Sequence, residues 1–513
     1  MQYTPKTKPF AHQAEEFELS RDMKMRALWW EQGTGKTKPV IDTLAWLFLQ
    51  GKIRGVLVMA PKGVAPNWAA DELDKHLPDN VRERAKVLLW DTAKSNTRSF
   101  QQRMDELLRH DGLAIVCMSY DGIMTEVATG AKRKDGWPKL RRGRELAKEL
   151  MTSRPTLMVL DESPRIKNPN TQRTKRVLSA GPYATYRRVL SGTPIANSPF
   201  DAYTQIQFLD PFFWQKYGCK GWPAFKTTFA DWANFLRDPS KCPHKAELRP
   251  HCGCLTFPKL LNYKNLVGLH DVMQQWGSRL LKKDVLDLPP KLFDKRRFAL
   301  SAKQQELYDK LRSEFMAILA DGSMITAPLV VTQLVRLQQI TSGYVVTDDG
   351  QMVQADVENP RVDLLMDVLE DTPHKAIVWA KFRQDFAQIG ARLLREEIPF
   401  VEYHGDTSTT DREEARRRFQ EDPEVKLFVA NATCAGEGLT LHAAQTVIYY
   451  NTDYKLAPRL QSEDRAHRIG QTHPVLYLDL IAEGSVDEKI IQALRDKKDI
   501  ADLIMGDPRG NWI

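Results

Sequence analysis

Short runs of apolar residues recur along the chain, and within each run the hydrophobicity is nearly continuous instead of alternating. The runs lie at residues 55–60, 113–119, 156–160 and 187–192, and then at 376–380, 400–403, 426–430, 446–450 and 475–481. Strands that helices cover on both faces have this pattern. Helical patterns separate many of the runs, for example at residues 411–422. Alternating strands and helices predict an α/β fold with parallel sheets.

The length of the chain predicts more than one domain. A single compact core does not extend over 513 residues, so we expect two large domains or more. Paired prolines interrupt the chain at residues 287–293, and we expect the break between domains there.

Composition narrows the class of protein only slightly. Lys and Arg number 74 against 66 Asp and Glu, which gives a net charge of +8 and a pI near 9.0. This excess fits a polyanionic partner and equally a solvated surface. No apolar run is long enough to cross a bilayer, and residues 1–13 lack the apolar core of a signal peptide. The six cysteines are few, so we expect a reducing, cytoplasmic compartment, with a nuclear location left open.

A glycine-rich loop near the start of the chain predicts a phosphate site. Such a site needs backbone N–H groups at a helix N-terminus together with a cation. Gly33 and Gly35 permit a tight backbone, Lys36 can neutralise phosphates, and Thr37 can bind Mg²⁺. The full phosphate-loop pattern has glycine where this chain has Trp30, so a glycine-rich turn that caps a helix is the alternative.

Two further segments carry residues suited to ATP hydrolysis. Asp161 and Glu162 end the apolar run at 156–160, where Asp161 can hold Mg²⁺ and Glu162 can polarise the attacking water. Arg465 and Arg468 are three residues apart, so we expect them to share one helical face and to stabilise charge on the γ-phosphoryl group. The alternatives are a solvated acidic turn and a basic helix surface.

Taken in order, these pieces resemble the Swi/Snf helicase-like family of superfamily-two helicases and translocases. The stretches that carry the resemblance are 58–68 (motif Ia), 118–123 (Ib), 190–211 (III), 279–291 (the junction before the second lobe), 334–344, 403–420 (IVa), 431–454 (V) and 460–471 (VI). Many members of this superfamily also lack glycine at the place of Trp30. The resemblance spans nearly the whole chain. In its size the chain is similar to compact bacterial or bacteriophage members of the family.

The resemblance implies the fold and its division. We expect two RecA-like parallel-sheet lobes in tandem with helical insertions and with ATP in the interlobe cleft. Lobe 1 would span residues 1–211, a helical protrusion with a Cys/His-rich insertion 212–288, a linker with a helical insertion 289–360, and lobe 2 residues 361–513.

The resemblance also implies roles for single residues. Gln13 would read adenine, and Thr34 and Gly438 would contact the nucleotide. Lys62 in motif Ia and Thr433 in motif V would contact DNA.

Motifs II and V depart from the family pattern, and Trp68 allows two interpretations. Ser163 and Pro164 replace the usual Ala-His of motif II, so coupling between the ATP site and motif III is expected to run differently. Glu437 stands in motif V where small or neutral residues are usual. Trp68 could touch nucleic acid, but packing on a helix face is the expected role.

A basic segment at residues 131–150 is a second candidate for DNA contact. Arg133 and Arg141 lie in this densest basic run of the chain, which could contact phosphates without reading sequence. A solvated charged loop is the alternative.

Cysteine and histidine residues also cluster in one stretch. Cys242, His244, Cys252 and Cys254 offer three thiolates and an imidazole, which suits tetrahedral Zn²⁺, and His251 competes as a ligand. Free cysteines in a surface insertion are the alternative.

The sequence therefore predicts an enzyme with ATP and Mg²⁺ as cofactors, a possible structural Zn²⁺ and nucleic acid as partner. The resemblance implies a DNA-dependent ATPase that moves along duplex DNA or remodels branched DNA. Alternatives are a strand-separating DNA or RNA helicase, an ATP-gated DNA-binding scaffold, and the motor subunit of a defence complex. We expect no membrane partner and a monomer, and the sequence names no protein partner.

Overall fold

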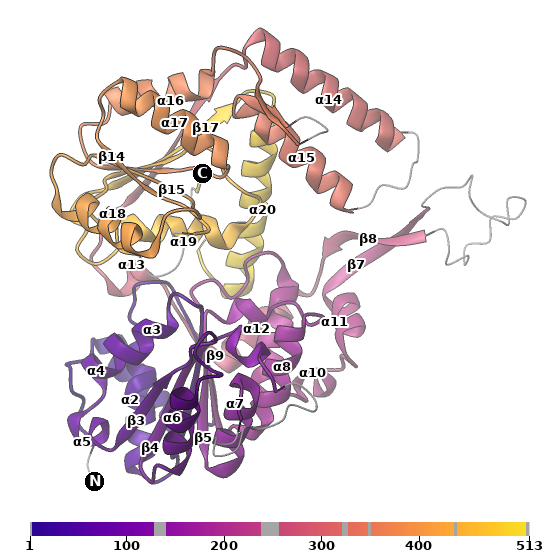
Figure 1. Cartoon of the computed structure of the whole chain (residues 1–513). Helices are drawn as coiled ribbons and strands as arrows, with labels where there is room; N and C mark the ends of the chain where they lie inside the picture. The colour runs from indigo at the N-terminus through magenta and orange to yellow at the C-terminus, as the bar shows by residue number, and fades with distance from the viewer. Residues whose placement is uncertain are drawn as a thin grey trace, which may run out of the picture. The chain divides into compact units, whose positions relative to one another are not determined.

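The protein, seen in a computed structural model, contains two parallel sheets that lie in separate units (Figure 1). The structure describes residues 3–127, 140–236, 256–320, 327–346, 350–434, 439–508 and 512–513. The first unit consists of residues 1–229, 265–287 and 501–507, and the second of residues 230–264, 288–500 and 508–513. The chain leaves the first unit at Asp287 and enters the second at Leu288, inside the stretch where paired prolines predicted a break.

The first sheet has seven strands, all parallel, in the order β3-β4-β2-β5-β6-β1-β9. Their bounds are β1 Met25–Trp30, β2 Gly55–Ala60, β3 Ala85–Leu89, β4 Leu113–Ser119, β5 Thr156–Asp161, β6 Tyr186–Leu190 and β9 Gly277–Leu280. Every residue of β2 and β5 is buried, as expected for strands with helices on both faces.

Helices of the first unit pack around this sheet (Figure 1). They are α1 Ala11–Ser20, α2 Thr37–Leu49, α3 Ala65–Asn67, α4 Leu73–His76, α5 Asp79–Arg82, α6 Arg98–Arg109, α7 Gly143–Ser153, α8 Gln172–Ala180, α9 Ala202–Leu209, α10 Phe213–Lys216, α11 Trp222–Phe229, α12 Leu266–Trp276 and α13 Lys282–Val285. Helix α20 spans Val486–Met505, and its end from Ala501 onward also belongs to this unit. Arg279 of β9 anchors the segment that follows α20, because its guanidinium donates to both carboxylate oxygens of Asp507 at 2.9 and 2.7 Å.

The second sheet has six parallel strands in the order β10-β17-β16-β13-β15-β14. Their bounds are β10 Lys291–Phe298, β13 Ala376–Trp379, β14 Phe400–Tyr403, β15 Leu427–Ala430, β16 Thr446–Tyr449 and β17 Val475–Ala482. The helices of this unit are α14 Ala302–Ala320, α15 Ala327–Thr341, α16 Pro360–Glu370, α17 Arg383–Arg395, α18 Thr409–Glu421 and α19 Leu456–Ala466, with most of α20. Two antiparallel pairs accompany it: β7 Ala230–Leu236 with β8 Thr256–Tyr263, and β11 Tyr344–Val346 with β12 Met352–Gln354.

Successive residues of the second sheet enter different hydrophobic clusters. Ile377 and Phe428 pack in one cluster, whereas their neighbours Val378 and Val429 pack in the other, and all four side chains are fully buried. Because successive side chains of a strand point to opposite faces, both faces of this sheet are covered. The predicted α/β class with two parallel-sheet lobes is therefore confirmed.

The sheets extend past the predicted lobe boundaries. β9 pairs with β1, so part of the expected protrusion at 212–288 belongs to the first sheet. β10 pairs with β17, so the expected linker at 289–360 supplies an edge strand of the second sheet. Among the described residues, no helix combines the length and apolar character that crossing a bilayer requires.

Candidate functional site

The glycine-rich loop connects β1 to the start of α2 at Thr37, as a phosphate loop requires. Gly33 and Gly35 adopt φ values of +85° and +76°, which L-residues with a side chain rarely adopt. A Cβ atom at Gly35 would lie 2.2 Å from Nε2 of Gln13, so a side chain there would displace the Gln13 amide. The backbone of the loop therefore leads directly into a helix N-terminus, where N–H groups can bind an anion.

Trp30, which stands at the place of the missing glycine, belongs to the hydrophobic core. It is 2% exposed, and its Nε1 donates to the Ser278 hydroxyl at 2.9 Å. That hydroxyl donates in turn to Glu16 at 2.7 Å. The last residue of β1 is thus a packing residue, and the turn that needs glycine begins three positions later.

Gln13 holds helix α1 against the glycine turn. Its side-chain Nε2 donates to the Gly35 carbonyl at 3.1 Å, and its Oε1 accepts from the Phe10 N–H at 2.9 Å. His12 Nε2 lies 2.9 Å from the carbonyl of Thr34 in the same turn. The predicted nucleotide residues Gln13 and Thr34 are therefore brought together with Gly35, and contact between Gln13 and adenine stays a prediction.

Lys36 and Glu162, predicted as the cation and the water-polarising base, face one another. Lys36 Nζ lies 4.0 Å from Glu162 Oε1, and Gln32 Nε2 donates to that same oxygen at 3.2 Å. Glu162 has a left-handed backbone with φ of +50°. Residues other than glycine rarely adopt the left-handed backbone conformation, and those that do are often found in functional sites.

Asp161 ends β5 and accepts hydrogen bonds from three sides. Trp68 Nε1 donates to its Oδ2 at 2.8 Å, and the Glu162 N–H donates to its Oδ1 at 2.9 Å. The Tyr120 hydroxyl donates to the Asp161 carbonyl at 2.8 Å. Trp68 therefore packs inside the protein, as expected, but it also contacts a predicted Mg²⁺ ligand. Sequence reasoning missed that role, since the two residues are 93 positions apart and no local pattern links them.

Ser163 connects the carboxylate turn to the segment that follows β6. Its hydroxyl donates to Gln205 Oε1 at 2.6 Å, and Gln205 Nε2 donates to the carbonyls of Pro194 and Asp201, each at 2.8 Å. Ser163 and Gln205 are both fully buried. A chain of hydrogen bonds therefore connects Ser163 to the loop at 191–201 through the Gln205 side chain.

Arg465 and Arg468 converge on one carbonyl, although they do not share a helical face. Helix α19 ends at Ala466, so Arg465 lies in its last turn and Arg468 in the turn beyond it. The expectation of a common helical face was wrong because the helix stops between them. Arg465 Nη1 donates to the Leu439 carbonyl at 3.2 Å, and Arg468 Nη1 donates to it at 3.4 Å. Both arginines belong to the second unit, whereas Lys36 and Asp161 belong to the first.

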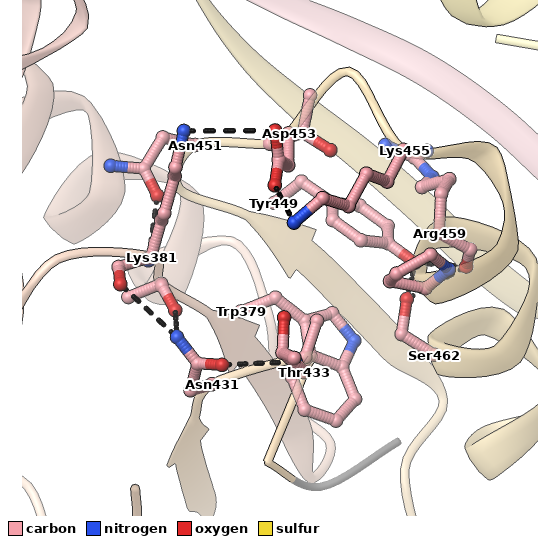
Figure 2. Close-up of a pocket in the computed structure, with 14 residues that line it drawn as sticks. Trp379, Lys381, Asn431, Thr433, Tyr449, Asn451, Asp453, Lys455, Arg459 and Ser462 are labelled. Atoms are coloured by element: carbon pink, nitrogen blue, oxygen red, sulfur yellow. Dashed lines mark hydrogen bonds and ion pairs between the residues drawn. The ribbon is translucent and has the colours of Figure 1, made fainter. Parts of the chain in front are cut away.

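A hollow in the second unit lies where β13, β15 and β16 end, and it contains Thr433 (Figure 2). Asn431 donates to the Lys381 carbonyl at 3.1 Å and accepts from the Thr433 N–H at 2.9 Å. Lys381 donates from Nζ to Gln338 at 2.7 Å, and burial lowers the pKa of this amine. Thr433 is exposed at the rim of this polar hollow, where the carboxyl ends of parallel strands commonly receive ligands.

The predicted DNA residues have different surroundings. Lys62 is exposed in the turn after β2. Arg141 is 5% exposed, pairs with Asp105, and donates from Nε to Glu149 at 2.8 Å. The prediction that Arg141 contacts DNA phosphates was wrong, because its guanidinium is buried and already pairs with these two carboxylates.

Several predicted residues lie outside the part of the chain that the structure describes: Arg133, Glu437, Gly438, Cys242, His244, His251, Cys252 and Cys254. Among the described residues there is no group of three or more His, Cys, Asp or Glu side chains that could hold a metal ion.

Comparisons with known proteins match nearly the whole chain. Residues 20–344 match the SNF2-related domain, and residues 360–470 match the helicase conserved C-terminal domain. The ATP-dependent helicase brm of Drosophila melanogaster is 25% identical over 501 residues, which cover 93% of this chain and 27% of that protein. The transcription regulatory protein SNF2 of Saccharomyces cerevisiae is 26% identical over 492 residues, which cover 92% of this chain and 26% of that protein. The chain thus spans about a quarter of the length of these relatives.

Among solved structures, the SWI2/SNF2 ATPase core of Sulfolobus solfataricus in complex with dsDNA is similar to this chain. It is 22% identical, the match covers 99% of this chain and 95% of that chain, and the TM-score is 0.39.

Proposed function

This chain belongs to the SNF2-related family, and on that basis we propose its function. The protein hydrolyses ATP to ADP and phosphate and uses the reaction to move along double-stranded DNA, or to remodel branched DNA, without reading sequence. The observation that carries this proposal is the group formed by Lys36, Asp161 and Glu162 beside the turn at Gly33 and Gly35. It supplies a cation, a metal-binding carboxylate and a base in one place.

The residues of the first unit fit Mg²⁺ and ATP. Thr37 stands at the N-terminus of α2, and the buried Asp161 carboxylate is held by Trp68. When bound, Mg²⁺ would neutralise charge on the phosphate oxygens. Lys36 binds the β- and γ-phosphates, and Glu162 orients a water molecule and accepts its proton. The left-handed backbone of Glu162 fixes the direction of that carboxylate.

For Arg465 and Arg468 of the second unit we propose a role on the γ-phosphoryl group. A guanidinium on the γ-phosphoryl group is worth on the order of 10³–10⁵ in rate. In the structure both side chains contact the Leu439 carbonyl, so binding of ATP would exchange a neutral acceptor for an anionic one. Closing and opening of the two units around ATP would shift their grip on DNA at Lys62 and Thr433.

ATPase assays with different nucleic acids test this function. Duplex DNA should stimulate hydrolysis more than single-stranded DNA or RNA of equal length. Greater stimulation by RNA, or no stimulation by any nucleic acid, would overturn the proposal. Displacement assays on forked and blunt duplexes distinguish tracking along duplex DNA from strand separation and from remodelling of branched DNA. Turnover itself excludes an ATP-gated scaffold, and a motor subunit of a defence complex would need a nuclease partner for cleavage.

We also propose a structural zinc ion at Cys242, His244, Cys252 and Cys254. The described strands β7 and β8 form an antiparallel pair that brings Leu236 opposite Thr256, so the two ends of the segment that carries these residues start side by side. A reducing, cytoplasmic compartment, which the few cysteines favour, would keep the thiols available for zinc.

A further inference from the structure

Asp161 is restrained by residues from three neighbouring strands. β4, β2 and β5 are adjacent in the first sheet and parallel, so their carboxyl ends meet at one edge. Tyr120 follows β4, Trp68 lies eight residues beyond β2, and Asp161 ends β5. The side chains of Tyr120 and Trp68 both reach Asp161 at this edge.

The contact from Trp68 restrains the carboxylate itself. Trp68 is 1% exposed and begins a π-helical turn, Trp68–Glu72, which sets the direction of its ring. An ionised carboxylate offers about four acceptor positions. Trp68 occupies one on Oδ2 and the Glu162 N–H occupies one on Oδ1. The carboxylate cannot rotate without losing a buried, charge-assisted hydrogen bond, so the direction of its remaining acceptor positions is fixed.

The contact from Tyr120 restrains the backbone at the same residue. Its hydroxyl donates to the Asp161 carbonyl just before the chain turns into the left-handed Glu162. Tyr120 is 3% exposed, so water does not compete for this hydrogen bond. The peptide that joins the two predicted catalytic carboxylates is thus held from one side by a single hydroxyl.

Trp68 also belongs to a segment with a proposed DNA contact, because it follows the exposed Lys62 by six residues. We propose that Trp68 and Tyr120 are positioning residues that hold the Asp161 carboxylate for Mg²⁺, and that Trp68 also transmits DNA contact at Lys62 to it. This inference rests on the proposed function and adds a physical route between Lys62 and the metal-binding carboxylate.

Trp68→Phe tests the metal arm of the proposal, because phenylalanine retains a large aromatic ring but has no N–H donor. We expect the Mg²⁺ concentration for half-maximal ATPase activity to rise about tenfold, since a hydrogen bond to a charged group is lost. Nucleotide binding measured in EDTA should stay at the wild-type value. Trp90→Phe is the matched control, because Trp90 is 6% exposed and its Nε1 donates to Thr92 at 3.0 Å in the same unit.

The ratio of ATPase rates with and without duplex DNA, measured at saturating Mg²⁺, tests the DNA arm. In Trp68→Phe this ratio should fall about fivefold, because the hydrogen bond that links its segment to Asp161 is lost. Tyr120→Phe, which removes the hydroxyl bonded to the Asp161 carbonyl, should raise the Mg²⁺ requirement about fivefold. An unchanged Mg²⁺ requirement in Trp68→Phe, or equal changes in Trp68→Phe and Trp90→Phe, would overturn the metal arm. An unchanged stimulation ratio in Trp68→Phe would overturn the DNA arm, and an unchanged Mg²⁺ requirement in Tyr120→Phe would overturn its positioning role.

Calorimetric binding of Mg²⁺·ADP separates this inference from the proposed function, since it needs neither DNA nor turnover. If the wild-type protein binds Mg²⁺·ADP and Trp68→Phe binds it about tenfold more weakly, Trp68 positions Asp161 even if DNA fails to stimulate hydrolysis. If both bind it equally, the metal arm fails, whatever the ATPase assays with DNA show.

Discussion

Gln205 is the residue whose substitution tests how the carboxylate turn communicates with the loop after β6. The sequence has Ser163-Pro164 where the family pattern that it resembles has Ala-His, and the structure offers a route through Ser163 and Gln205. Gln205→Leu removes the acceptor of the Ser163 hydroxyl and the donor to two carbonyls. Ser163→Ala removes only the hydroxyl that Gln205 Oε1 accepts.

The magnitude follows from the number of buried groups left without a partner. Each unsatisfied buried group costs about 1–3 kcal/mol, and a fully buried leucine returns about 1.5–3 kcal/mol. Gln205→Leu, which leaves three groups, should therefore lower the free energy of unfolding by about 3 kcal/mol, and Ser163→Ala by about 1 kcal/mol. In the double variant the Ser163 hydroxyl is absent as well, so the combined loss should fall short of the sum by about 1 kcal/mol.

Urea-induced unfolding of the four proteins, followed by tryptophan fluorescence, measures this cycle, and DNA-stimulated ATPase activity measures its consequence. Gln101→Leu is the matched control, because Gln101 is fully buried in the same unit and also makes three hydrogen bonds, to Ser95 and to the backbone of Arg141. It should lose similar stability but keep wild-type stimulation by DNA. Additive losses in the cycle, or equal loss of stimulation in Gln101→Leu and Gln205→Leu, would refute the proposed route.

Three other predictions concern the second unit. Arg468→Ala should lower kcat about 10³-fold with little change in ATP affinity, whereas Arg417→Ala on the exposed face of α18 should change neither; an equal loss in rate and affinity would contradict a role on the transferred phosphoryl group. Burial raises the pKa of Asp385 to about 6, so the stability it contributes is fully present below about pH 4 and is lost as pH rises through 6. Asp385→Asn should remove about 1.5 kcal/mol of this pH dependence in urea titrations at pH 5 to 8, and an unaltered pH profile would reject the assignment. Elemental analysis of the purified protein should find about one zinc per chain, and its absence would favour free cysteines.

The fold was largely predictable because strands buried on both faces leave long apolar runs. Among the strands that the pattern missed, β9 and β10 have a mixed composition. β10 alternates exposed and half-buried residues and carries Lys295, Arg296 and Arg297, because it lies at the edge of its sheet. β9 has four residues, of which Arg279 is charged, and its place beside β1 depends on tertiary contacts.

The site was predictable where its chemistry is local. Gly33, Gly35 and Lys36 form a contiguous signal, and so do Asp161 and Glu162. Arg141 was predicted wrongly, because a basic run in the sequence does not indicate which carboxylates will lie beside it. In the folded chain, Asp105 and Glu149 surround this guanidinium.

The partners that hold the site together are distant in sequence. Trp68 and Tyr120 act on Asp161 across 93 and 41 positions, and Gln205 acts on Ser163 across 42. A single sequence carries no spacing rule for such pairs, so only the folded chain shows them.

ATP hydrolysis by Lys36→Ala in the presence of duplex DNA tests whether the turn at Gly33 and Gly35 holds the phosphates of ATP. We expect this variant to lose DNA-stimulated turnover while it still binds DNA, because Lys36 is the cation proposed for the phosphates. Lys52→Ala is the control, since Lys52 is an exposed lysine of the same unit that pairs with Asp22, and it should hydrolyse ATP at the wild-type rate. Turnover by Lys36→Ala near the wild-type rate would contradict the assignment of the phosphate site and the mechanism built on it.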